Sequence, residues 1–570
     1  MRYGTTNPNV DSGPFGEKLY IGFYRKFDYS QPLENGGYAM VDERRWVDNE
    51  FQGERPKANY DNMLDGGFEK RLYYEFALNY DRTFGNHYVA MLALVNRNEI
   101  EGLAGGSASS LKFKENQEDW VTRVVYNWKE KYLLEFNGAY SGSQKFARGK
   151  RFQFFPSYSL GWRISEEPFV KKITGKMFDN IKIRYSSGKV GYHQSATAYT
   201  YQQLYDNVGG NVGFGENERT NYGPLYVEGK AANPNATWET GYKQNLGLDL
   251  VMFNKLTATL DMYTEKREGI IMTVATPAWF GIREPDGNIG ETKSRGLEAE
   301  IGWNDRINKD WSYWVKANYA INENRIVYRN DAANLPQYLK LAGKPIGVIN
   351  KLQVNGYYES LDDIYNYVTA TNVSTQSNLV PGDFMYLDYD ANGVIDQTWD
   401  KIPMQYNNYP QNTYGGMLGF RYKSFQVNAM FYGVINVYKD VDGLFLWDLS
   451  EGNAQNYFAN PDVIHRWTRE NPAHAKKPAL HSDYRGYSMS GGTTYSFQNA
   501  SYFRLKNLEL SYDLKNSSLT EIGINTVQLY VNANNVFTIT KFNSQVDPEA
   551  NSSGLYPLVR RYNIGTRITF

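Results

Sequence analysis

The stretch that decides the fold is Pro557–Phe570, which reads PLVRRYNIGTRITF. From Tyr562 onward two sets of residues alternate, and the more apolar set is Tyr562, Ile564, Thr566, Ile568 and Phe570. Successive side chains of a β-strand point to opposite faces, so this segment predicts a strand with one apolar and one wet face. A strand of this kind that ends on an aromatic residue is typical of a membrane β-barrel, whose outer face meets lipid and whose last strand closes the wall. We therefore expect Tyr562, Ile568 and Phe570 to form a membrane-insertion signal.

The composition supports a β-protein and excludes several other classes. The 570 residues include 48 Tyr, 29 Phe and 12 Trp, and strands and the interfacial girdles of barrels are rich in such residues. No run of about 18 apolar residues exists, so the sequence offers no candidate transmembrane helix. The lack of cysteine excludes disulfides and thiolate metal sites, and a net charge of −1 gives no basis for a nucleic-acid partner. The amino-terminal residues lack the charged and apolar regions of a signal peptide, so we expect none within this sequence.

Alternation of apolar and polar residues predicts about fifteen strands along the chain. The cleanest segment is Leu297–Trp303, with its apolar residues on one face and Glu298 and Glu300 on the other. Other clear segments are Tyr74–Tyr80, Tyr88–Asn96, Tyr132–Tyr140, Leu256–Thr264, Phe425–Phe431 and Val527–Ala533.

The predicted connections between these strands alternate in length. The short ones are Asp81–His87, Lys129–Lys131, Met252–Lys255, Asn304–Asp310 and Tyr422–Ser424, and the intermediate Arg163–Asp179 and Asp513–Thr526 fall in the same series. The long ones are Arg97–Asp119, Ser187–Trp238, Glu265–Thr292, Asn324–Thr413, Val434–Asn499 and Lys541–Tyr556. Outer-membrane barrels combine short periplasmic turns with long extracellular loops.

These patterns together predict an all-β fold, a transmembrane antiparallel β-barrel with about 15–16 strands in this chain. A soluble sandwich or propeller is the alternative, because the strands of those folds also alternate. Propeller blades repeat at about 40–50 residues, and the sequence shows no such repeat.

Seven segments, in order, resemble the SusC/RagA family of TonB-dependent outer-membrane transporters. They are Phe154–Phe169, Asp179–Gly191, Trp238–Thr240, Gly296–Glu298, Ala500–Leu508, Leu529–Thr538 and Asp547–Glu549. The resemblance runs from about Tyr74 to Phe570, and its specificity comes from the order of the segments rather than from any one of them.

The resemblance implies a fold, a function and a set of partners. Family members form a 22-stranded barrel around a plug domain. They lie in the outer membrane of Gram-negative bacteria and import oligosaccharides or oligopeptides. A SusD-like surface lipoprotein covers the extracellular loops as a lid, and TonB supplies energy across the periplasm. The expected partners are therefore this lipoprotein, the TonB complex acting through the plug, and the lipid bilayer.

The chain departs from the family pattern in one large respect. The amino-terminal regulatory-like domain, the plug and about six barrel strands have no counterpart in the sequence. We therefore expect residues 1–570 to form the carboxy-terminal part of a TonB-dependent receptor barrel, which a second chain or a further segment completes.

An acidic segment, Asp388–Asp400, resembles a cation-binding loop. Hard cations such as Ca²⁺ or Mg²⁺ take oxygen ligands, and Gly393 allows the sharp turn that such a loop requires. The candidate ligands are Asp388, Asp390, Asn392, Asp396 and Asp400 through their side chains, and Val394 through its carbonyl. The Glu that usually occupies the twelfth position is replaced by Trp399, so an Asp/Asn/Gly-rich turn without metal is the alternative.

Aromatic residues in the long connections are candidates for contact with cargo or with the lipoprotein. They are Trp279, Phe280, Trp447, Tyr457, Phe458 and Trp467. Packing of the loops into ordered caps is the alternative role for these residues.

No motif in the chain indicates an enzyme. Glu298 and Glu300 are expected to face a watery lumen, and neither a nucleophile elbow nor a phosphate-binding loop occurs. The sequence therefore favours the barrel of an importer. A soluble β-rich protein that binds or hydrolyses carbohydrate is the second hypothesis.

Overall fold

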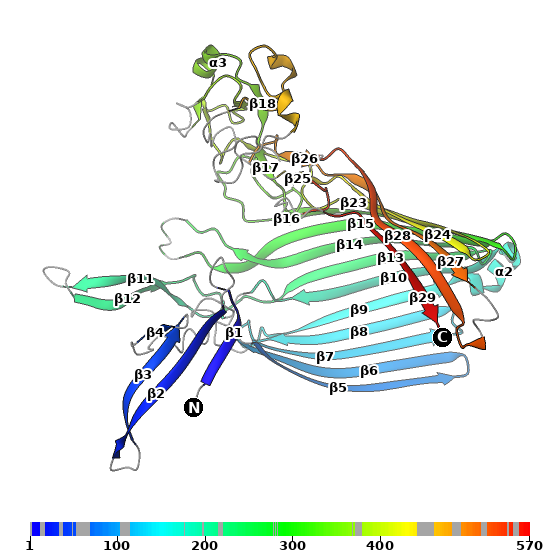
Figure 1. Cartoon of the computed structure of the whole chain (residues 1–570). Coiled ribbons are helices and arrows are strands. Elements are labelled where there is room, and N and C mark those ends of the chain that lie inside the picture. The colour runs from blue at the N-terminus through cyan, green and yellow to red at the C-terminus, as the bar shows by residue number, and fades with distance from the viewer. Residues whose placement is uncertain are drawn as a thin grey trace.

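The structure is a computed structural model, and it describes nineteen segments of the chain (Figure 1). They are residues 3–11, 18–32, 38–47, 50–52, 69–102, 115–175, 177–196, 199–214, 220–277, 279, 281, 283–367, 369–370, 379–441, 461–480, 492–514, 521–543, 546–550 and 558–570, with 50–52 and the three segments before it described as backbone strands. No helix among these residues is long and apolar enough to cross a membrane.

One antiparallel sheet of 15 strands dominates the fold. Every strand pairs with its neighbours in chain order, as a meander, and the sheet curves as a trough in Figure 1. Its strands are β5 (Glu69–Phe84), β6 (His87–Gly102), β7 (Glu115–Trp128), β8 (Tyr132–Ser143), β9 (Phe152–Arg163), β10 (Phe178–Tyr192), β13 (Glu239–Met252), β14 (Leu256–Thr273), β15 (Asp286–Arg306), β16 (Trp311–Tyr328), β23 (Asn412–Tyr422), β24 (Phe425–Ile435), β27 (Tyr502–Leu514), β28 (Thr526–Thr540) and β29 (Arg561–Thr569). The predicted all-β class and the predicted number of strands are confirmed.

Short and long connections lie at opposite ends of the sheet, as the sequence predicted. The short end carries η1 (Ile164–Glu166) and α2 (Pro168–Thr174) between β9 and β10, and α2 and α3 (Leu361–Asn366) lie far apart in Figure 1. The predicted boundaries are less accurate, because β5 continues to Phe84 and β15 to Arg306.

Two of the short connections are mirror-image β-turns. Lys129 and Glu130 have φ of 54° and 55°, and Phe253 and Asn254 have φ of 56° and 53°. Positive φ at both central residues matches the right-handed twist of the flanking strands, so these turns join adjacent strands without splaying them.

The long connections contain small structures of their own. They are the hairpin of β11 (Tyr205–Phe214) and β12 (Thr220–Glu228), the pairs β17 (Asn350–Leu352) with β22 (Lys401–Pro403), β18 (Val354–Tyr357) with β20 (Phe384–Tyr386), β19 (Thr369–Ala370) with β21 (Val394–Ile395) and β25 (Tyr438–Asp440) with β26 (Phe497–Asn499), and the short helices α3, η3 (Pro461–His465) and η4 (Pro472–His474). A separate sheet contains β1 (Tyr3–Asp11), β2 (Lys18–Pro32), β3 (Tyr38–Val47) and β4 (Glu50–Gln52), which the sequence analysis did not predict.

A continuous apolar row crosses nine strands on one face of the sheet. In ladder order from β6 to β16 it comprises Val89, Tyr126, Leu134, Leu160, Tyr185, Leu246, Met262, Leu297 and Ile321. Leu134, Leu160, Leu246 and Met262 are 44–50% exposed, so no second layer covers them. An uncovered apolar surface of this extent requires an apolar environment outside the chain. We call this side the apolar face and the opposite side the polar face.

Aromatic residues border the apolar face near the short connections. Trp128 stacks on Tyr132, Tyr132 on Trp162, and Trp311 lies 4.4 Å from Tyr422 between ring centroids. At the other end of β8, Tyr140 stacks on Phe152. Tyr132 and Tyr140 are about 26 Å apart along the strand, from the rise per residue. The nine residues from Tyr132 to Tyr140 thus span the distance between two aromatic girdles, as in a membrane strand.

The buried hydrophobic clusters lie at the long-connection end rather than against the middle of the sheet. One cluster centres on Phe384 and Tyr386 of β20 and joins Val434 and Tyr502 of the barrel strands. A second contains Phe146, Phe155, Ala196, Ala236 and Trp238. The middle of the sheet is thus a single layer, and the loops supply their own cores.

Candidate functional site

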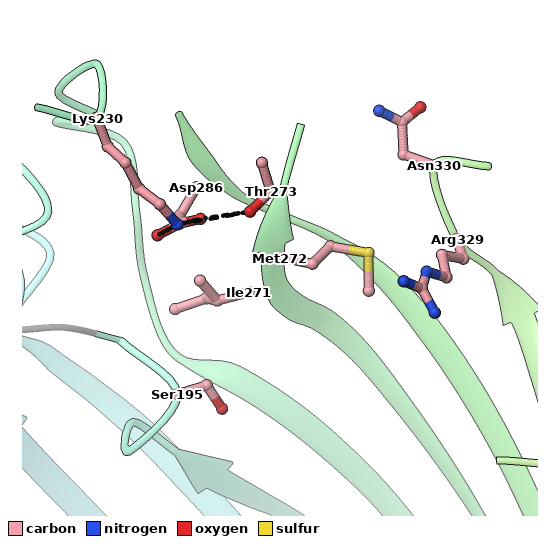
Figure 2. A pocket seen from close by; sticks show the side chains of 8 residues that line it. All are labelled: Ser195, Lys230, Ile271, Met272, Thr273, Asp286, Arg329 and Asn330. Atoms are coloured by element: carbon pink, nitrogen blue, oxygen red, sulfur yellow. Dashed lines mark hydrogen bonds and ion pairs between the residues drawn. The ribbon is translucent and has the colours of Figure 1, made fainter. Parts of the chain in front are cut away.

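A recess opens at the long-connection end, between the ends of β14, β15 and β16 (Figure 2). It has a cavity volume of about 460 Å³. On one side, Lys230 Nζ lies 2.7 Å from Asp286 Oδ1, and Thr273 donates a hydrogen bond to the same oxygen at 3.1 Å. On the other side lie Met272 and Arg329, as Figure 2 shows. This recess was not predicted from the sequence, because its lining residues come from three separate long connections and form no local motif.

The polar face carries a charged cluster in the middle of the sheet. Arg184 on β10 donates to both oxygens of Asp249 on β13, at 2.8 and 2.9 Å, and to both oxygens of Asp261 on β14, at 3.1 Å. A Cβ atom at Gly247 would lie 2.6 Å from the guanidinium carbon of Arg184, so glycine makes room for this arginine. Glu298 lies opposite Asp261 in the register of β14 and β15, so its side chain is on the same polar face, as predicted.

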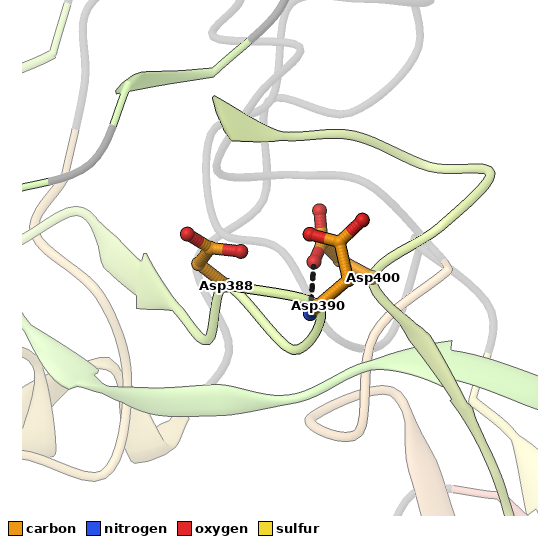
Figure 3. A group of neighbouring side chains, drawn as sticks. All are labelled: Asp388, Asp390 and Asp400. Atoms are coloured by element: carbon orange, nitrogen blue, oxygen red, sulfur yellow. Dashed lines mark hydrogen bonds between the residues drawn. The ribbon is translucent and has the colours of Figure 1, made fainter. Parts of the chain in front are cut away.

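Three of the six predicted cation ligands come together in the connection between β16 and β23 (Figure 3). One carboxylate oxygen from each of Asp388, Asp390 and Asp400 lies within 4.8 Å of the other two. Asp388 and Asp390 follow β20 and Asp400 precedes β22, so the intervening loop returns Asp400 to the first two residues. Val394, expected to offer its carbonyl, lies in β21 beside β19.

Asp400 organises this loop from a fully buried position. Its Oδ1 accepts hydrogen bonds from the backbone amides of Tyr389 at 2.7 Å and Asp390 at 3.4 Å. Its Oδ2 accepts one from the amide of Asp396 at 2.7 Å. A carboxylate held by backbone amides at both ends of the loop fixes the loop's shape.

Asp388 supplies the oxygen best placed to bind a cation. Its Oδ2 accepts from the amide of Gly393 at 2.9 Å, whereas its Oδ1 is buried and receives no hydrogen bond from any described residue. Burying such an oxygen without a partner is unfavourable, and Ca²⁺ takes ligands of this kind. Asp390, by contrast, uses both of its oxygens on Asn392, and Asp396 Oδ1 accepts from two backbone amides of the next turn.

The carboxylates of this loop act electrostatically on the neighbouring Tyr338. Burial raises the pKa of Tyr338, and Asp390 and Asp400 raise that pKa further because they oppose a phenolate. The ring of Tyr338 meets that of Tyr389 edge-on, with 4.6 Å between centroids. The loop therefore offers closely spaced negative charge next to an unpartnered oxygen, which suits a hard cation.

The structure places two of the six predicted aromatic contact residues. Trp279 is 83% exposed in the connection between β14 and β15. Trp467 is 7% exposed and lies so close to Gly382 that a Cβ atom there would be 2.6 Å from its ring, so it packs the loops, the alternative role considered above. Phe280, Trp447, Tyr457 and Phe458 lie outside the described residues.

The predicted insertion signal lies on and just after β29. Tyr562 pairs with Ala533 and Ile568 with Val527, which places both on the apolar face. Tyr562 is 67% exposed and Phe570 is 81% exposed. On the opposite face Arg567 pairs with Glu509 at 3.2 Å and lies over the ring of Tyr530. The alternation predicted for this segment is confirmed, and its role in insertion stays a prediction.

A single-layer antiparallel meander with one apolar and one polar face, aromatic girdles and all long loops at one end is the wall of a transmembrane β-barrel. The fold class expected from the sequence is therefore confirmed.

Comparison with known proteins identifies the family. The family model described as "TonB dependent receptor-like, beta-barrel" matches residues 3–536, and the chain belongs to this family. The match includes the amino-terminal residues, where the sequence analysis had found no resemblance.

The chain is similar to two curated relatives. It is 28% identical over 546 residues to TonB-dependent receptor P3 of Formosa agariphila, covering 86% of this chain and 52% of the relative. It is 26% identical over 462 residues to TonB-dependent receptor SusC of Bacteroides thetaiotaomicron, covering 79% of this chain and 43% of the relative. The predicted resemblance to SusC is thus confirmed, and the chain spans about half the length of these relatives.

Two solved structures share the fold across the whole chain. One is titled the RagAB peptide transporter, with a TM-score of 0.65 and 18% identity, and the match covers 58% of its chain. The other is the RagAB peptide importer in its 'open-open' state, with a TM-score of 0.66 and 19% identity, covering 57% of that chain.

Proposed function

We propose that this chain forms barrel wall in an outer-membrane importer of a Gram-negative bacterium. The importer takes up oligosaccharides or oligopeptides with a SusD-like surface lipoprotein as its lid, and TonB energises it. The family membership and the names of the relatives support this proposal over a soluble carbohydrate-binding or hydrolysing protein. The role is transport, without catalysis by the barrel.

The apolar row is the observation that carries the proposal. Leu246 lies in this row, whereas its chain neighbours Asn245 and Gly247 lie on the polar face with Asp261. One residue along the chain therefore separates a surface suited to lipid from a surface suited to water. A wall between bilayer and aqueous channel has this property, and a soluble sandwich, whose apolar face is covered by a second sheet, does not.

The sheet edges support a partner that completes the barrel. Within the described residues β5 pairs only with β6, β29 pairs only with β28, and the two outer strands do not pair with each other. Backbone groups inside a bilayer must be hydrogen-bonded, so an open edge is not stable there. We propose that further strands, from a second chain or from more of the same protein, join β5 to β29.

The loops give two further roles to the extracellular end. We propose that Trp279, which is exposed, contacts cargo or the lipoprotein. The acidic loop is proposed to bind Ca²⁺ or Mg²⁺ through Asp388, Asp390 and Asp400, which would stiffen the connection between β16 and β23.

Fractionation and identification of co-purifying chains test the proposal. Cells that produce the protein are broken, and the outer membrane is separated from the aqueous fraction. We expect the protein in the outer membrane, migrating differently on a gel before and after boiling, together with a lipoprotein and a plug-bearing segment. Recovery in the aqueous fraction would refute the transport proposal.

A further inference from the structure

A second recess adjoins the one in Figure 2 at the same end of the sheet. The two recesses share Met272 and Arg329 as lining residues, and the second has a cavity volume of about 480 Å³. Both lie at the ends of β14, β15 and β16, and we call the two adjoining recesses together the rim cavity.

The cations of the rim cavity fall into two groups. Lys230 is neutralised by Asp286 at 2.7 Å, and Arg267 by Glu265 at 3.2 Å. Arg329 also lines the cavity and has no acidic partner among the described residues. Lys293 lines it as well, but its register with Lys266 places its side chain on the apolar face with Leu297. The paired ions cancel, so the cavity retains one positive charge, that of Arg329, for an incoming ligand.

The remaining lining of the second recess is mainly aliphatic. Ile270, Ile326 and Ile346 lie beside Met272, and Tyr328 is the one aromatic residue that lines it. Branched aliphatic and thioether side chains pack well against aliphatic groups of a ligand. Sugar rings pack preferentially on flat aromatic faces, of which this recess offers one. The lining therefore favours a ligand with an aliphatic side chain and a nearby anion.

We propose that the rim cavity binds the carboxyl-terminal end of an oligopeptide. The terminal carboxylate pairs with Arg329, whose planar guanidinium can donate two parallel hydrogen bonds to it. The last apolar side chain of the peptide lies on Met272 and the neighbouring isoleucines. This inference rests on the proposed import function and selects peptides from its two cargo classes.

Arg329 is well suited to a test by substitution. It follows the end of β16, its side chain is exposed, and no ion pair of the described residues depends on it. Arg329→Gln should therefore fold. Arg325 on the same strand is also exposed, carries the same charge and does not line either recess, which makes Arg325→Gln a matched control.

The experiment uses the protein purified from the outer membrane with its accompanying chains. It is immobilised and exposed to a proteolytic digest of casein, half of which has its carboxyl groups amidated, and the retained peptides are counted by mass spectrometry. We expect the free peptides to be enriched about ten-fold over their amidated counterparts, as for a charge-assisted pair. The enrichment should fall to near parity in Arg329→Gln and persist in Arg325→Gln.

Three results would overturn the inference. The first is equal retention of free and amidated peptides, and the second is an unchanged enrichment in Arg329→Gln. The third is retention of no peptide, including the case in which an oligogalacturonate probe binds instead. If the protein still fractionates with the outer membrane, each of these results refutes peptide binding in the rim cavity but leaves the proposed import function standing. Recovery of the protein in the aqueous fraction would refute both proposals.

Discussion

Arg504 at the start of β27 is completely buried although it carries a charge. Its guanidinium donates to both oxygens of Asp547, at 2.6 and 2.7 Å, and to Glu549 at 2.8 Å. Asp547 and Glu549 belong to the connection between β28 and β29, so this ion cluster anchors that connection to the barrel. The Asp-Pro-Glu segment singled out in the sequence thus has a structural role that its spacing did not reveal.

Replacing Arg504 tests how much this anchor contributes. Arg504→Gln leaves Asp547 without its cation, whereas Glu549 keeps its ion pair with Lys506 at 2.9 Å, and we expect a loss of about 3–5 kcal/mol in the free energy of unfolding. Denaturant unfolding in detergent measures the loss. The control is Arg295→Gln, since Arg295 pairs with Glu323 at 2.7 Å but is largely exposed; there we expect less than about 1 kcal/mol. Equal losses in both variants would contradict the anchor.

His193 gives the loop layer a defined pH dependence. It follows β10, its Nδ1 lies 3.0 Å from Ser143 Oγ, and its ring packs on Trp238. Burial lowers the pKa of His193, and Lys145 lowers it further, although Glu115 and Asp119 oppose these effects. The folded loop therefore holds the neutral imidazole.

The sign of the pH effect follows from this lowered pKa. Above the unfolded pKa of about 6.5 the imidazole is neutral in both states and costs nothing. As the pH falls below that value, the unfolded chain takes up a proton that the folded loop resists, so the loop loses stability. We expect the protection factors of the amides of residues 193–196, which are exchange rates compared with the intrinsic rate at each pH, to decrease from pH 7.5 to pH 5.5, and this decrease to shrink in His193→Gln. The same decrease in both proteins would contradict this prediction.

At the scale of elements, the two faces of β13 should differ in how well they tolerate a charged side chain. Leu246 belongs to the apolar row, and its neighbour Asn245 donates to Asp261 on the polar face at 2.8 Å. Leu246→Lys places a charge in lipid, which costs about 2–4 kcal/mol near the bilayer midplane. Asn245→Lys instead places the same charge beside a carboxylate. We expect the first variant to reduce the folded fraction in the outer membrane strongly and the second to leave it near wild type, as measured by heat-dependent gel migration. The reverse order would contradict the assignment of the faces.

The acidic loop makes a prediction about cations. Tyr389 and Trp399 lie within it, so a bound Tb³⁺ ion should be sensitised by their excitation, and Ca²⁺ should displace it. Asp388→Asn removes charge at the unpartnered oxygen, and we expect it to weaken Ca²⁺ competition about ten-fold. Asp362→Asn in the first turn of α3 is the control within the same long connection. A Tb³⁺ signal that is absent in the wild-type protein, or equal in all three proteins, would contradict a metal role.

Strands were predictable element by element because each carries its own alternation. Leu297–Trp303 is one example, and the structure places it within the 21-residue strand β15. The outer parts of β15 were not predicted because charged residues there, such as Glu291 and Lys293, occupy the face that is apolar in the middle of the strand, so the apolar–polar alternation ends. The turn at Phe253 and Asn254 was located but not typed, since its positive φ values follow from the twist of the paired strands and not from an Asn-Gly signal.

The candidate sites were predictable only where they are local. Asp388, Asp390 and Asp400 lie within 13 consecutive residues, so a motif could reveal them. The long-range contacts could not be found in this way. Lys351, for example, pairs with Asp440, 89 residues away, and the rim cavity joins residues from Ser195 to Ile346. Such contacts depend on how the sheet arranges its loop ends, which one sequence does not show.

At the scale of the whole molecule, the central claim is that one wall separates two solvents. The polar face holds Arg184, Asp249 and Asp261, and the apolar face holds the nine-residue row. This division explains why the hydrophobic cores lie in the loops, because a barrel wall needs no core of its own. It also explains why the open edges of the sheet need further strands, because a barrel wall must be closed along every edge.

Spin-label accessibility along β14 tests the claim most directly. The chain has no cysteine, so each variant from Thr257 to Tyr263 can carry a single nitroxide label in the outer-membrane protein reconstituted into lipid. We predict a period of two: labels at 258, 260 and 262 collide mainly with oxygen dissolved in the bilayer, and labels at 257, 259, 261 and 263 collide mainly with a water-soluble nickel complex. A profile without this period, or labels at 258, 260 and 262 shielded from both reagents as in a protein interior, would contradict the account.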